Sequence, residues 1–341
     1  MRIIHCIYSF NTGGSETMLV DILNQQCKTE EVSLIIINES YTETLFNRID
    51  SRVNIIKLNR KEHSKSIVHF IKLKYILHKL KPDVIHLHNA SLARLIHHDK
   101  LFFTAHCLGI PTTYFYKFHT IIAISDAVKD DIVKRGNYPV VVIQNGIRIG
   151  DISVRKELKR GENFRIIQLG RLDCEVKGQD ILIDALSILV SGGIKNIFVD
   201  FIGAGHSYSS LKDIVKKRNL EKYVCFLGLK DRDYIYSHLK DYDLMCHPSR
   251  SEGFGLAVVE GMAAKIPVLV ASSGGPYEII QKDKYGYSFV SGAANDCADK
   301  ILSIFNNYNQ IQNVVNNAYN YACDTFSIES MVSKYLAEYI K

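Results

Sequence analysis

No stretch of the sequence offers the roughly 18 consecutive apolar residues that a membrane-spanning helix needs. The chain begins MRIIHCIYSFNTGG, where a short apolar run meets a polar glycine turn without an A-x-A-like cleavage site. This run predicts a first strand and not a signal peptide. We therefore expect a cytoplasmic protein that is neither exported by this route nor integral to a membrane.

Cysteine pairs with metal-binding or redox spacing are also missing. The eight cysteines are scattered, with no CxxC pair and no zinc-ligand spacing, which predicts reduced, mostly buried thiols. Low-complexity segments and short-period repeats do not occur either. Hydrophobic residues make up 47% and charged residues 23%, as in an ordinary globular protein. Disordered, collagen-like and disulfide-stapled classes are therefore excluded.

The length predicts two domains. At 341 residues the chain exceeds the size at which one hydrophobic core usually keeps growing. A polar, charge-rich stretch at 148–162 separates two similar patterns. We therefore predict an N-terminal domain at 1–147, a linker at 148–162, a second domain at 163–322, and a C-terminal helix at 323–341 that is able to cross back to the first domain.

Short apolar runs alternate with helix-length segments in both halves. The runs that predict strands are 3–8, 34–37, 53–56, 84–87, 101–104, 121–124 and 140–143, then 164–169, 197–202, 223–226, 244–246, 268–270 and 287–290. Strands separated by crossovers of this length pair in parallel, because the connection must travel back along the sheet. The predicted fold class is α/β, with two doubly wound, Rossmann-like domains whose sheets present their carboxyl ends to one cleft.

The net charge of +6 does not by itself distinguish an anionic small substrate from a membrane surface. Its distribution is more informative, because the segment 64–81 (SKSIVHFIKLKYILHKLK) is rich in lysine. The segment places Ile67, Phe70, Ile71, Tyr75, Leu77 and Leu80 among Lys65, Lys72, Lys74, Lys79 and Lys81. This pattern is typical of a helix with an apolar stripe and basic margins. It fits either an ordinary helix packed on the sheet or a helix that binds an anionic membrane.

Two glycines and two cations follow predicted strands. Gly13 and Gly14 form a strand-to-helix turn whose amides suit an anion. Because the full G-x-G-x-x-G fingerprint is absent, the two glycines fit equally a turn with a structural role only. Arg171 and Lys177 follow the strand at 164–169. The bidentate guanidinium of the arginine and the ammonium of the lysine suit a diphosphate at this place. Alternatively, the two residues are an ordinary solvated pair on the protein surface.

Two glutamates flank a glycine-rich turn that opens a predicted helix. Glu252 precedes Gly253 and Gly255, the helix begins near Leu256, and Glu260 lies within it. The helix N-terminal amides suit a phosphate or sugar oxygen, and each carboxylate accepts hydrogen bonds from sugar or ribose hydroxyls. Alternatively, the two glutamates only cap the helix and face water.

The two glutamates form an E-x7-E pattern in the segment EGFGLAVVEGMA, which is preceded by HPSRS and followed by PVLVASSGGPYEII. This pattern resembles the signature of the family 4 retaining glycosyltransferases, which have the GT-B fold. The segments VIQNGI, GRLDCEVKGQD, FIGAG and FLG match the same family in the same order. The match is dense from about residue 145 to about residue 280 and thin before Ala105.

The resemblance implies transfer of a sugar from a nucleotide diphosphate sugar, with UDP-sugar favoured, to a glycan or lipid-linked acceptor. It implies retention at the anomeric carbon without cofactor or metal. The implied catalytic residues are His106 beside the donor sugar, the diphosphate-binding pair Arg171 and Lys177, and Glu252 near the sugar. The implied donor-binding residues are Gly13, Gly14, Gly253, Phe254, Gly255, Leu256 and the ribose-binding Glu260. The implied setting is bacterial capsule or lipopolysaccharide assembly. The resemblance implies a protein that is peripheral on the inner face of the cell membrane and has no nucleic-acid partner.

Some features depart from the family pattern or leave alternatives open. Gly261 stands where alanine is usual and Lys265 where glycine is usual, so we expect a looser or closely packed helix around Gly261. The D-x-D at 231–233 precedes a predicted helix away from the phosphate motifs, and we interpret it as a helix cap. Two other functions stay open, namely a sugar-nucleotide epimerase of GT-B fold and a non-catalytic partner subunit of a transferase.

Overall fold

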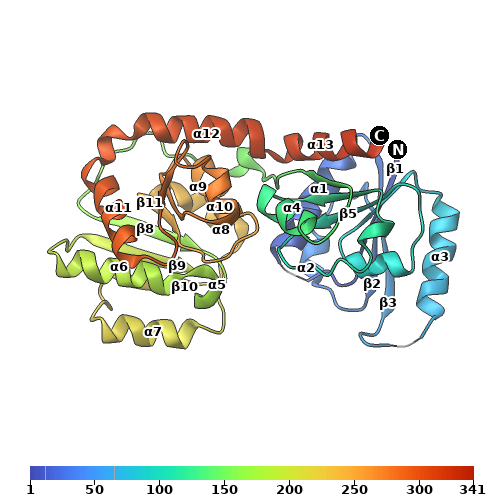
Figure 1. The fold of residues 1–341 in the computed structure, drawn as a ribbon, viewed down its shortest axis with the longest axis horizontal. Coiled ribbons are helices and arrows are strands. Elements are labelled where there is room, and N and C mark those ends of the chain that lie inside the picture. Colours follow the sequence, from blue (N-terminus) through green and yellow to red (C-terminus); the bar gives the residue numbers. More distant parts are fainter. Residues whose placement is uncertain (12, 65) are drawn as a thin grey trace. The chain divides into compact units, whose positions relative to one another are not determined.

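Two parallel sheets flanked by helices organise the chain in the computed structural model, which describes residues 1–11, 13–64 and 66–341 (Figure 1). The chain divides into unit 1, which comprises Met1–Ile147 with Ile328–Lys341, and unit 2, which comprises Arg148–Ser327. The last helix therefore belongs to the same unit as the first strand.

Unit 1 contains a seven-stranded sheet of order β3-β2-β1-β4-β5-β6-β7. Its strands are β1 (Arg2–Ile7), β2 (Glu31–Asn38), β3 (Asn54–Arg60), β4 (Val84–Leu87), β5 (Leu101–Ala105), β6 (Thr120–Ala123) and β7 (Val140–Val142). Its α-helices are α1 (Gly14–Gln26), α2 (Glu43–Phe46), α3 (Val68–Leu80), α4 (Asp126–Val133) and α13 (Ile328–Ile340).

Unit 2 contains a six-stranded sheet of order β10-β9-β8-β11-β12-β13. Its strands are β8 (Phe164–Leu169), β9 (Ile197–Ile202), β10 (Val224–Gly228), β11 (Leu244–His247), β12 (Val268–Ala271) and β13 (Tyr287–Phe289). Its α-helices are α5 (Cys174–Lys177), α6 (Gln179–Ser191), α7 (Tyr208–Lys217), α8 (Arg232–His238), α9 (Leu256–Ala263), α10 (Gly274–Ile279), α11 (Ala294–Asn306) and α12 (Gln312–Phe326).

The inner strands are apolar because helices cover both faces of each sheet. β1 reads RIIHCI and β2 reads EVSLIIIN, and every residue after the first is buried in both. Such runs are typical of parallel strands that are covered on both sides. In unit 1, α13 packs on α1, whereas in unit 2 α6 packs on α7 and α11, and α9 packs on α10 and α12. The predicted doubly wound α/β class is confirmed.

Each sheet has one point at which the strand order reverses. This point lies between β1 and β4 in unit 1 and between β8 and β11 in unit 2. Because the connections leave those two strands in opposite directions, a crevice forms at their carboxyl ends, where open α/β sheets bind ligands. The residues that follow these strands are therefore the first candidates for a functional site.

All thirteen predicted strands are present. Those at 84–87, 164–169 and 197–202 have the predicted ends, and the other ten differ by one to four residues at one end or both. The sheet extends β2 back to Glu31 and β3 on to Arg60, and the pairing of Asn38 with Arg60 continues the ladder through polar residues that hydropathy does not mark. The sequence pattern does not predict α2 and α5, because four-residue helices are too short to show a helical period.

The charge-rich stretch at 148–162 is part of unit 2. Arg155 Nη2 donates a hydrogen bond to Asp243 Oδ1 at 2.9 Å, and Leu158 belongs to the buried core of the unit. The segment between the two predicted domains is thus held by side-chain contacts of the second.

The cysteines are all free. Cys6, Cys27, Cys246 and Cys297 are buried, two others are half-buried, and two are exposed. The prediction of mostly buried thiols therefore holds for half of them.

The lysine-rich segment at 64–81 forms α3, which begins at Val68, while Lys65 lies outside the described residues. The six apolar residues that predict one stripe divide between two faces, and this corrects the prediction. Phe70, Leu77 and Leu80 are half-buried on the side of α3 that packs on β3, whereas Ile67, Ile71 and Tyr75 are exposed. No helix in the described part of the chain is both long and apolar enough to cross a membrane.

Candidate functional site

The reversal point of unit 2 brings three loops together. They follow β8, β11 and β12, which are neighbours in the sheet. The loop after β11 is tied to the loop after β8 by a hydrogen bond from the Arg250 amide to the Val176 carbonyl at 2.9 Å. It is tied to the loop after β12 by one from the Gly275 amide to the Glu252 carbonyl at 3.1 Å. The predicted phosphate and carboxylate motifs therefore meet at one edge of the sheet.

Two glycines allow this close approach. Gly178 has a φ of 64°, and a Cβ atom there would lie 2.1 Å from the Pro248 carbonyl oxygen. A Cβ atom on Gly275 would lie 2.4 Å from the Cα atom of Phe254. Larger residues at either position would push the loops apart.

Arg250 fixes the loops further through its side chain. Its guanidinium donates to both carboxylate oxygens of Asp180, at 2.8 and 2.6 Å, and to the carbonyl of Cys174 at 2.6 Å. A bidentate pair of this kind restricts both orientation and distance. The sequence motif HPSRS contains Arg250 but does not reveal its partner, which lies 70 residues earlier in the chain.

Lys177 and Glu252 form an ion pair in which the lysine ammonium donates to Glu252 Oε2. The imidazole Nε2 of His247 lies 3.5 Å from the same carboxylate oxygen and 3.1 Å from Ser249 Oγ. Burial alone would raise the pKa of Glu252, but the hydrogen bond to His247 and the charge of Lys177 outweigh it and lower the pKa to about 2. Glu252 is therefore a carboxylate throughout the neutral pH range.

Arg171 lies beside Lys177 with its guanidinium largely in solvent. The Lys177 side chain passes over Gly170, where a Cβ atom would lie 3.8 Å from its Cδ and Cε atoms. Arg171 Nη2 donates to Asp173 Oδ2 at 2.9 Å, and the arginine side chain is 64% exposed. An exposed guanidinium with one carboxylate partner is free to turn towards an incoming anion.

Helix α9 presents its N-terminus at this edge. Its N-cap is Gly255, whose φ of 106° is in the region that favours glycine. Gly253 and Leu256 lie on either side of the turn, and Phe254 is buried against Phe326 with ring centroids 5.8 Å apart. The packing of Phe254 on Phe326 thus fixes the turn, and the backbone amides at the N-terminus of α9 remain available to an anion.

Glu260 lies one turn further along α9. Burial raises the pKa of its carboxyl to about 7, although the positive charge of Arg232 opposes part of the shift. A carboxyl that titrates near neutral pH in a candidate site is a functional indicator.

One of the two departures from the family pattern, Gly261, has a structural reason. A Cβ atom on Gly261 would lie 2.9 Å from both Met245 Sδ and Val268 Cγ1, so α9 packs closely on β11 and β12 at this point. Of the two expectations for this helix, close packing is confirmed. Lys265 has a φ of 56°, a conformation in which glycine is the usual residue.

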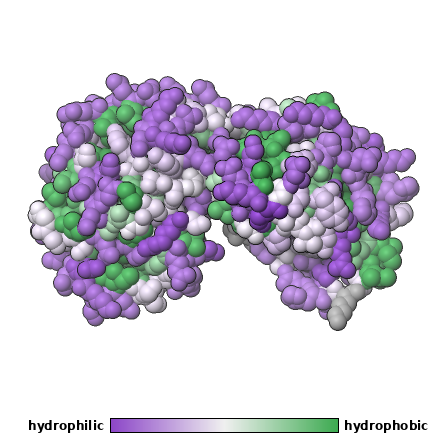
Figure 2. Space-filling view, in the orientation of Figure 1, coloured by the Kyte–Doolittle hydropathy of each residue, from purple (hydrophilic) through white to green (hydrophobic). Residues whose placement is uncertain are grey.

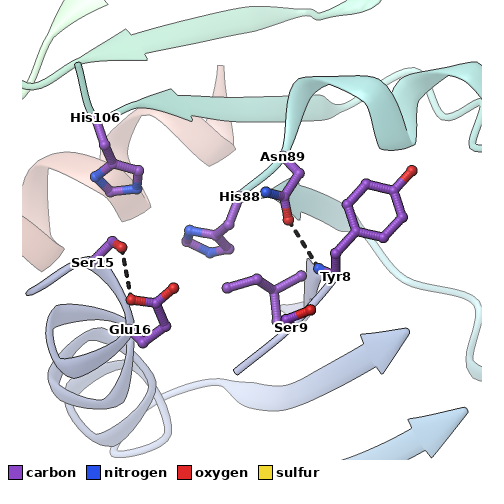
Figure 3. A pocket seen from close by; sticks show the side chains of 8 residues that line it. Tyr8, Ser9, Ser15, Glu16, His88, Asn89 and His106 are labelled. Carbon is purple, nitrogen blue, oxygen red and sulfur yellow. Dashed lines mark hydrogen bonds between the residues drawn. The ribbon is translucent and has the colours of Figure 1, made fainter. Parts of the chain in front are cut away.

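Unit 1 has a pocket at its own reversal point, with a volume of about 210 Å³ (Figure 3). It is lined by Ile7, Tyr8, Ser9, Ser15, Glu16, His88, Asn89 and His106. The Tyr8 amide donates to Asn89 Oδ1 at 2.9 Å and so ties the end of β1 to the end of β4. Gly13 is the extended N-cap of α1, and Gly14 is the first residue of that helix, beside the pocket residues Ser15 and Glu16.

His106 and His88 border this pocket and belong to a row of stacked imidazoles. The His88 ring lies 6.1 Å from that of His106 and 5.0 Å from that of the buried His86. Burial lowers the pKa of His106 to about 4 and that of His88 well below its ordinary value, so both rings are neutral at pH 7. Among 13 histidines the sequence pattern gives no reason to select His88; its place after β4, next to β1 in the sheet, is the signal that the topology adds.

A hydrogen-bond chain sets the tautomer of His88. Gln26 Oε1 lies 2.7 Å from His5 Nε2, and His5 Nδ1 lies 3.0 Å from His88 Nε2. Because an amide oxygen only accepts, His5 carries its proton on Nε2 and accepts from His88 Nε2–H. The Nδ1 atom of a neutral His88 is then an acceptor.

The predicted site residues therefore fall into two groups. Gly13, Gly14 and His106 belong to unit 1, and Arg171, Lys177, Glu252, Gly253, Phe254, Gly255, Leu256 and Glu260 belong to unit 2. Within unit 2 the structure joins Lys177 directly to Glu252. His247, Arg250 and Asp180 are supporting residues of this group that the sequence pattern does not single out.

The D-x-D at 231–233 is a helix cap. Asp231 Oδ1 accepts a hydrogen bond from the Tyr234 amide at 2.8 Å at the start of α8, which confirms the interpretation from sequence. Across residues 1–11, 13–64 and 66–341, no group of three or more His, Cys, Asp or Glu side chains is placed to hold a metal ion.

Comparison with known proteins identifies the chain's relatives. The family model described as "Glycosyl transferases group 1" matches residues 151–321, and the one described as "Glycosyltransferase Family 4" matches residues 12–150. The uncharacterized glycosyltransferase MJ1178 of Methanocaldococcus jannaschii is 34% identical over 58% of this chain and 54% of its own length. The poly(ribitol-phosphate) alpha-N-acetylglucosaminyltransferase of Staphylococcus aureus is 26% identical over 64% of this chain and 43% of its own length. The chain thus spans about half the length of the curated relatives it matches.

A solved structure matches the whole chain in fold. Anabaena Alr3699/HepE, in complex with UDP and glucose, has a TM-score of 0.82 at 21% identity and covers 100% of this chain and 99% of its own.

Proposed function

Because the chain belongs to the group 1 glycosyltransferase family, we propose that it transfers a sugar from a UDP-sugar to a glycan or lipid-linked acceptor, with retention at the anomeric carbon and without a metal ion. The observation that carries the proposal is the meeting of Lys177, Glu252 and the N-terminus of α9 at the reversal point of unit 2. Cations and helix amides there suit a diphosphate, and a carboxylate beside them suits sugar hydroxyls.

The cations explain how such a site would accelerate transfer. In the reaction, the bond between the anomeric carbon and the phosphate oxygen breaks while the bond to the acceptor oxygen forms on the same face. The acceptor hydroxyl gives its proton to the departing phosphate oxygen. Negative charge therefore grows on the diphosphate, and fixed positive charges at Lys177 and Arg171 stabilise the transition state more than the bound donor.

We propose that the donor enters by separating the ion pair between Lys177 and Glu252. Lys177 exchanges its carboxylate partner for a phosphate oxygen, so it keeps an anionic partner throughout. Glu252 stays ionised, since His247 remains next to it. Its carboxylate is then free to accept hydrogen bonds from the donor sugar.

Support for the other parts of the proposal comes from the relatives. Alr3699/HepE was crystallised with UDP, which favours UDP as the nucleotide. The name of the Staphylococcus aureus relative gives poly(ribitol-phosphate) as its acceptor, which favours a polymeric acceptor. We further propose that Glu260 holds the ribose, that the main chain at 253–256 contacts sugar and phosphate, and that neutral His106 contacts the donor sugar.

A screen of nucleotide sugars for slow hydrolysis tests the function without an acceptor. We expect free UDP and free sugar from at least one UDP-sugar, and much less product from the GDP-sugars. Product analysis separates the alternatives: an epimerised nucleotide sugar without release of UDP would show an epimerase. No turnover of any donor would favour a non-catalytic partner subunit.

The same assay tests the metal independence. We expect hydrolysis to persist in excess EDTA, because Lys177, Arg171 and the α9 amides take the place of a cation at the diphosphate. The control is a parallel reaction with added Mg²⁺ or Mn²⁺ in place of EDTA. Loss of activity in EDTA that either cation restores would refute the prediction.

A further inference from the structure

Two buried glutamines flank the loop that carries Arg171 and Lys177. Figure 2 shows hydrophilic side chains over most of the visible surface of unit 2. Gln168 and Gln179, in contrast, are only 2% and 1% exposed. Gln168 is in β8, before the loop, and Gln179 is the first residue of α6, after it. Because a buried amide is unfavourable unless its polar atoms find partners, two of them beside one loop require an explanation.

Each glutamine holds the carbonyl group of one of the two cations. Gln168 Nε2 donates a hydrogen bond to the Lys177 carbonyl at 2.9 Å, and Gln179 Nε2 donates one to the Arg171 carbonyl at 2.9 Å. Since a carbonyl oxygen only accepts, these contacts fix which way each amide points. The strand before the loop is thus linked to the end of the loop, and the helix after it to the beginning, so both ends of the segment 171–177 are fixed.

Only the donor half of each amide is used. Among the residues that the structure describes, none donates to the Oε1 atom of Gln168 or of Gln179, although both atoms are buried. A buried acceptor without a partner is destabilising, and a leucine or methionine of similar size would avoid this loss. What the two unfavourable positions have in common is the hydrogen bond to the main chain of a cation.

Main-chain hydrogen bonds hold other parts of the same loop. The Leu172 amide donates to the Ala204 carbonyl at 3.0 Å, and the Lys177 amide donates to the Asp173 carbonyl at 2.7 Å. The glutamines add hydrogen bonds at Lys177 and Arg171, the two residues whose side chains meet the diphosphate in the proposed function. A long side chain such as that of Arg171, which is 64% exposed, reaches a ligand reproducibly only when its main chain is fixed.

We propose that Gln168 and Gln179 are positioning residues for the diphosphate of the donor, Gln168 through Lys177 and Gln179 through Arg171. The two amides turn the carbonyl dipoles of the cations towards themselves and away from the phosphates. They also fix the main chain from which the ammonium and the guanidinium reach the diphosphate. The inference rests on the proposed function, because it requires that the two cations meet a diphosphate.

Changing each glutamine to methionine in the full chain tests the proposal. Methionine has nearly the same length and flexibility but no donor. We expect the kcat for hydrolysis of the UDP-sugar that is turned over fastest to fall about 10- to 100-fold, as when a catalytic group is displaced by about 1 Å. The matched control is Gln312→Met, which removes a hydrogen bond from the Leu158 amide at 2.9 Å elsewhere in unit 2 and should leave kcat within about threefold of wild type.

A double-mutant cycle separates positioning from support of the fold. Lys177→Ala retains the carbonyl that Gln168 holds, so Gln168→Met should lower the melting temperature equally with and without the Lys177 side chain. Its effect on kcat should differ, falling below about threefold in the Lys177→Ala background. In the Arg171→Ala background, Gln168→Met should still lower kcat about tenfold or more. The cycles of Gln179 should show the reverse dependence on the two cations.

Gln168→Glu supplies a second variant in case the methionine variant does not fold. A neutral carboxyl group can donate its O–H to the Lys177 carbonyl, whereas a carboxylate cannot. Because burial favours the neutral form, the kcat of the variant relative to the wild type should be highest near about pH 5 and should fall towards about pH 8.

Three results would overturn the inference: a kcat of both methionine variants within about threefold of wild type, equal losses of kcat with and without the Lys177 side chain, or a relative kcat of Gln168→Glu that does not change with pH. Normal turnover by Lys177→Ala and Arg171→Ala would instead overturn the proposed function, and this inference with it.

Discussion

Lys177→Ala or Arg171→Ala is expected to lower the rate of sugar transfer by about 100- to 1,000-fold, the usual loss when one preorganised electrostatic group is removed from a transition state. The loss should fall mainly on kcat, because the charge that these residues meet grows as the diphosphate departs. Lys177 should show the larger effect. Its side chain is held in place by Glu252, whereas that of Arg171 is largely exposed.

A matched control distinguishes this effect from a general loss of positive charge. Lys222→Ala removes an exposed lysine from unit 2 outside the loops of the site and should leave kcat unchanged. Thermal unfolding should show that Arg171→Ala is folded, because the Arg171 side chain is 64% exposed and its buried partner Asp173 also lies 4.0 Å from His206 Nε2. If both site variants turn over within about threefold of the wild type, Lys177 and Arg171 do not bind the diphosphate.

The fold was predictable because the same alternation of apolar runs and helix-length segments occurs in both halves of the sequence. Each strand is a short apolar run, and each crossover is long enough for a helix, so the pattern of β1 to β7 reappears from β8 to β13. What the pattern could not give is the order of the strands and the exact ends. Edge pairing, such as that of Asn38 with Arg60, depends on backbone hydrogen bonds that side-chain hydropathy does not report.

The site was predictable only in part, and the residues show why. Arg171, Lys177, Glu252 and Glu260 stand in compact motifs at the ends of strands, where chain position and chemistry coincide. His88 stands in no such motif, and His247 is the first residue of HPSRS but its carboxylate partner is not apparent from that motif. His88 is bound to His5, which is 83 residues away, and the closeness of His247 to Glu252 depends on how the loop after β11 folds back. The two faces of α3 could not be separated from sequence either, because apolar residues lie on both.

Glu260 leads to the second large prediction, a strong pH dependence of nucleotide binding. Burial raises the pKa of this carboxyl from its ordinary value of 4.5 to about 7. If Glu260 accepts hydrogen bonds from the ribose hydroxyls, then only the ionised form binds well, and UDP binding must release a proton below neutral pH. The dissociation constant of UDP should therefore rise by up to about tenfold for each pH unit below 7.

The Glu260→Gln variant provides the control, since glutamine has nearly the same shape and cannot ionise. UDP has titrating groups of its own, so the measured quantity is the ratio of the wild-type and variant affinities, obtained by calorimetry from about pH 5 to about pH 8. The ratio should favour the wild type increasingly as the pH rises towards 7 and should level off above it. A ratio that does not change with pH would mean that the Glu260 charge takes no part in holding the nucleotide.

The same shift has a consequence for the stability of the ligand-free protein, with the opposite sign. The folded-state pKa of Glu260 lies above its ordinary value, so its contribution to stability is complete below about pH 4.5 and is lost as the pH rises through about 7. Above that pH the wild type holds a negative charge that partial burial disfavours and that Glu260→Gln lacks. We therefore expect the variant to unfold at a higher temperature than the wild type at pH 8 and at a similar temperature at pH 5, as followed by calorimetry without ligand.

Saturating UDP should raise the wild-type melting temperature far more than that of the variant at pH 8, because bound ribose hydroxyls stabilise the carboxylate. A variant that is less stable than the wild type at both pH values, and equally protected by UDP, would show that Glu260 is a structural residue and not the ribose ligand.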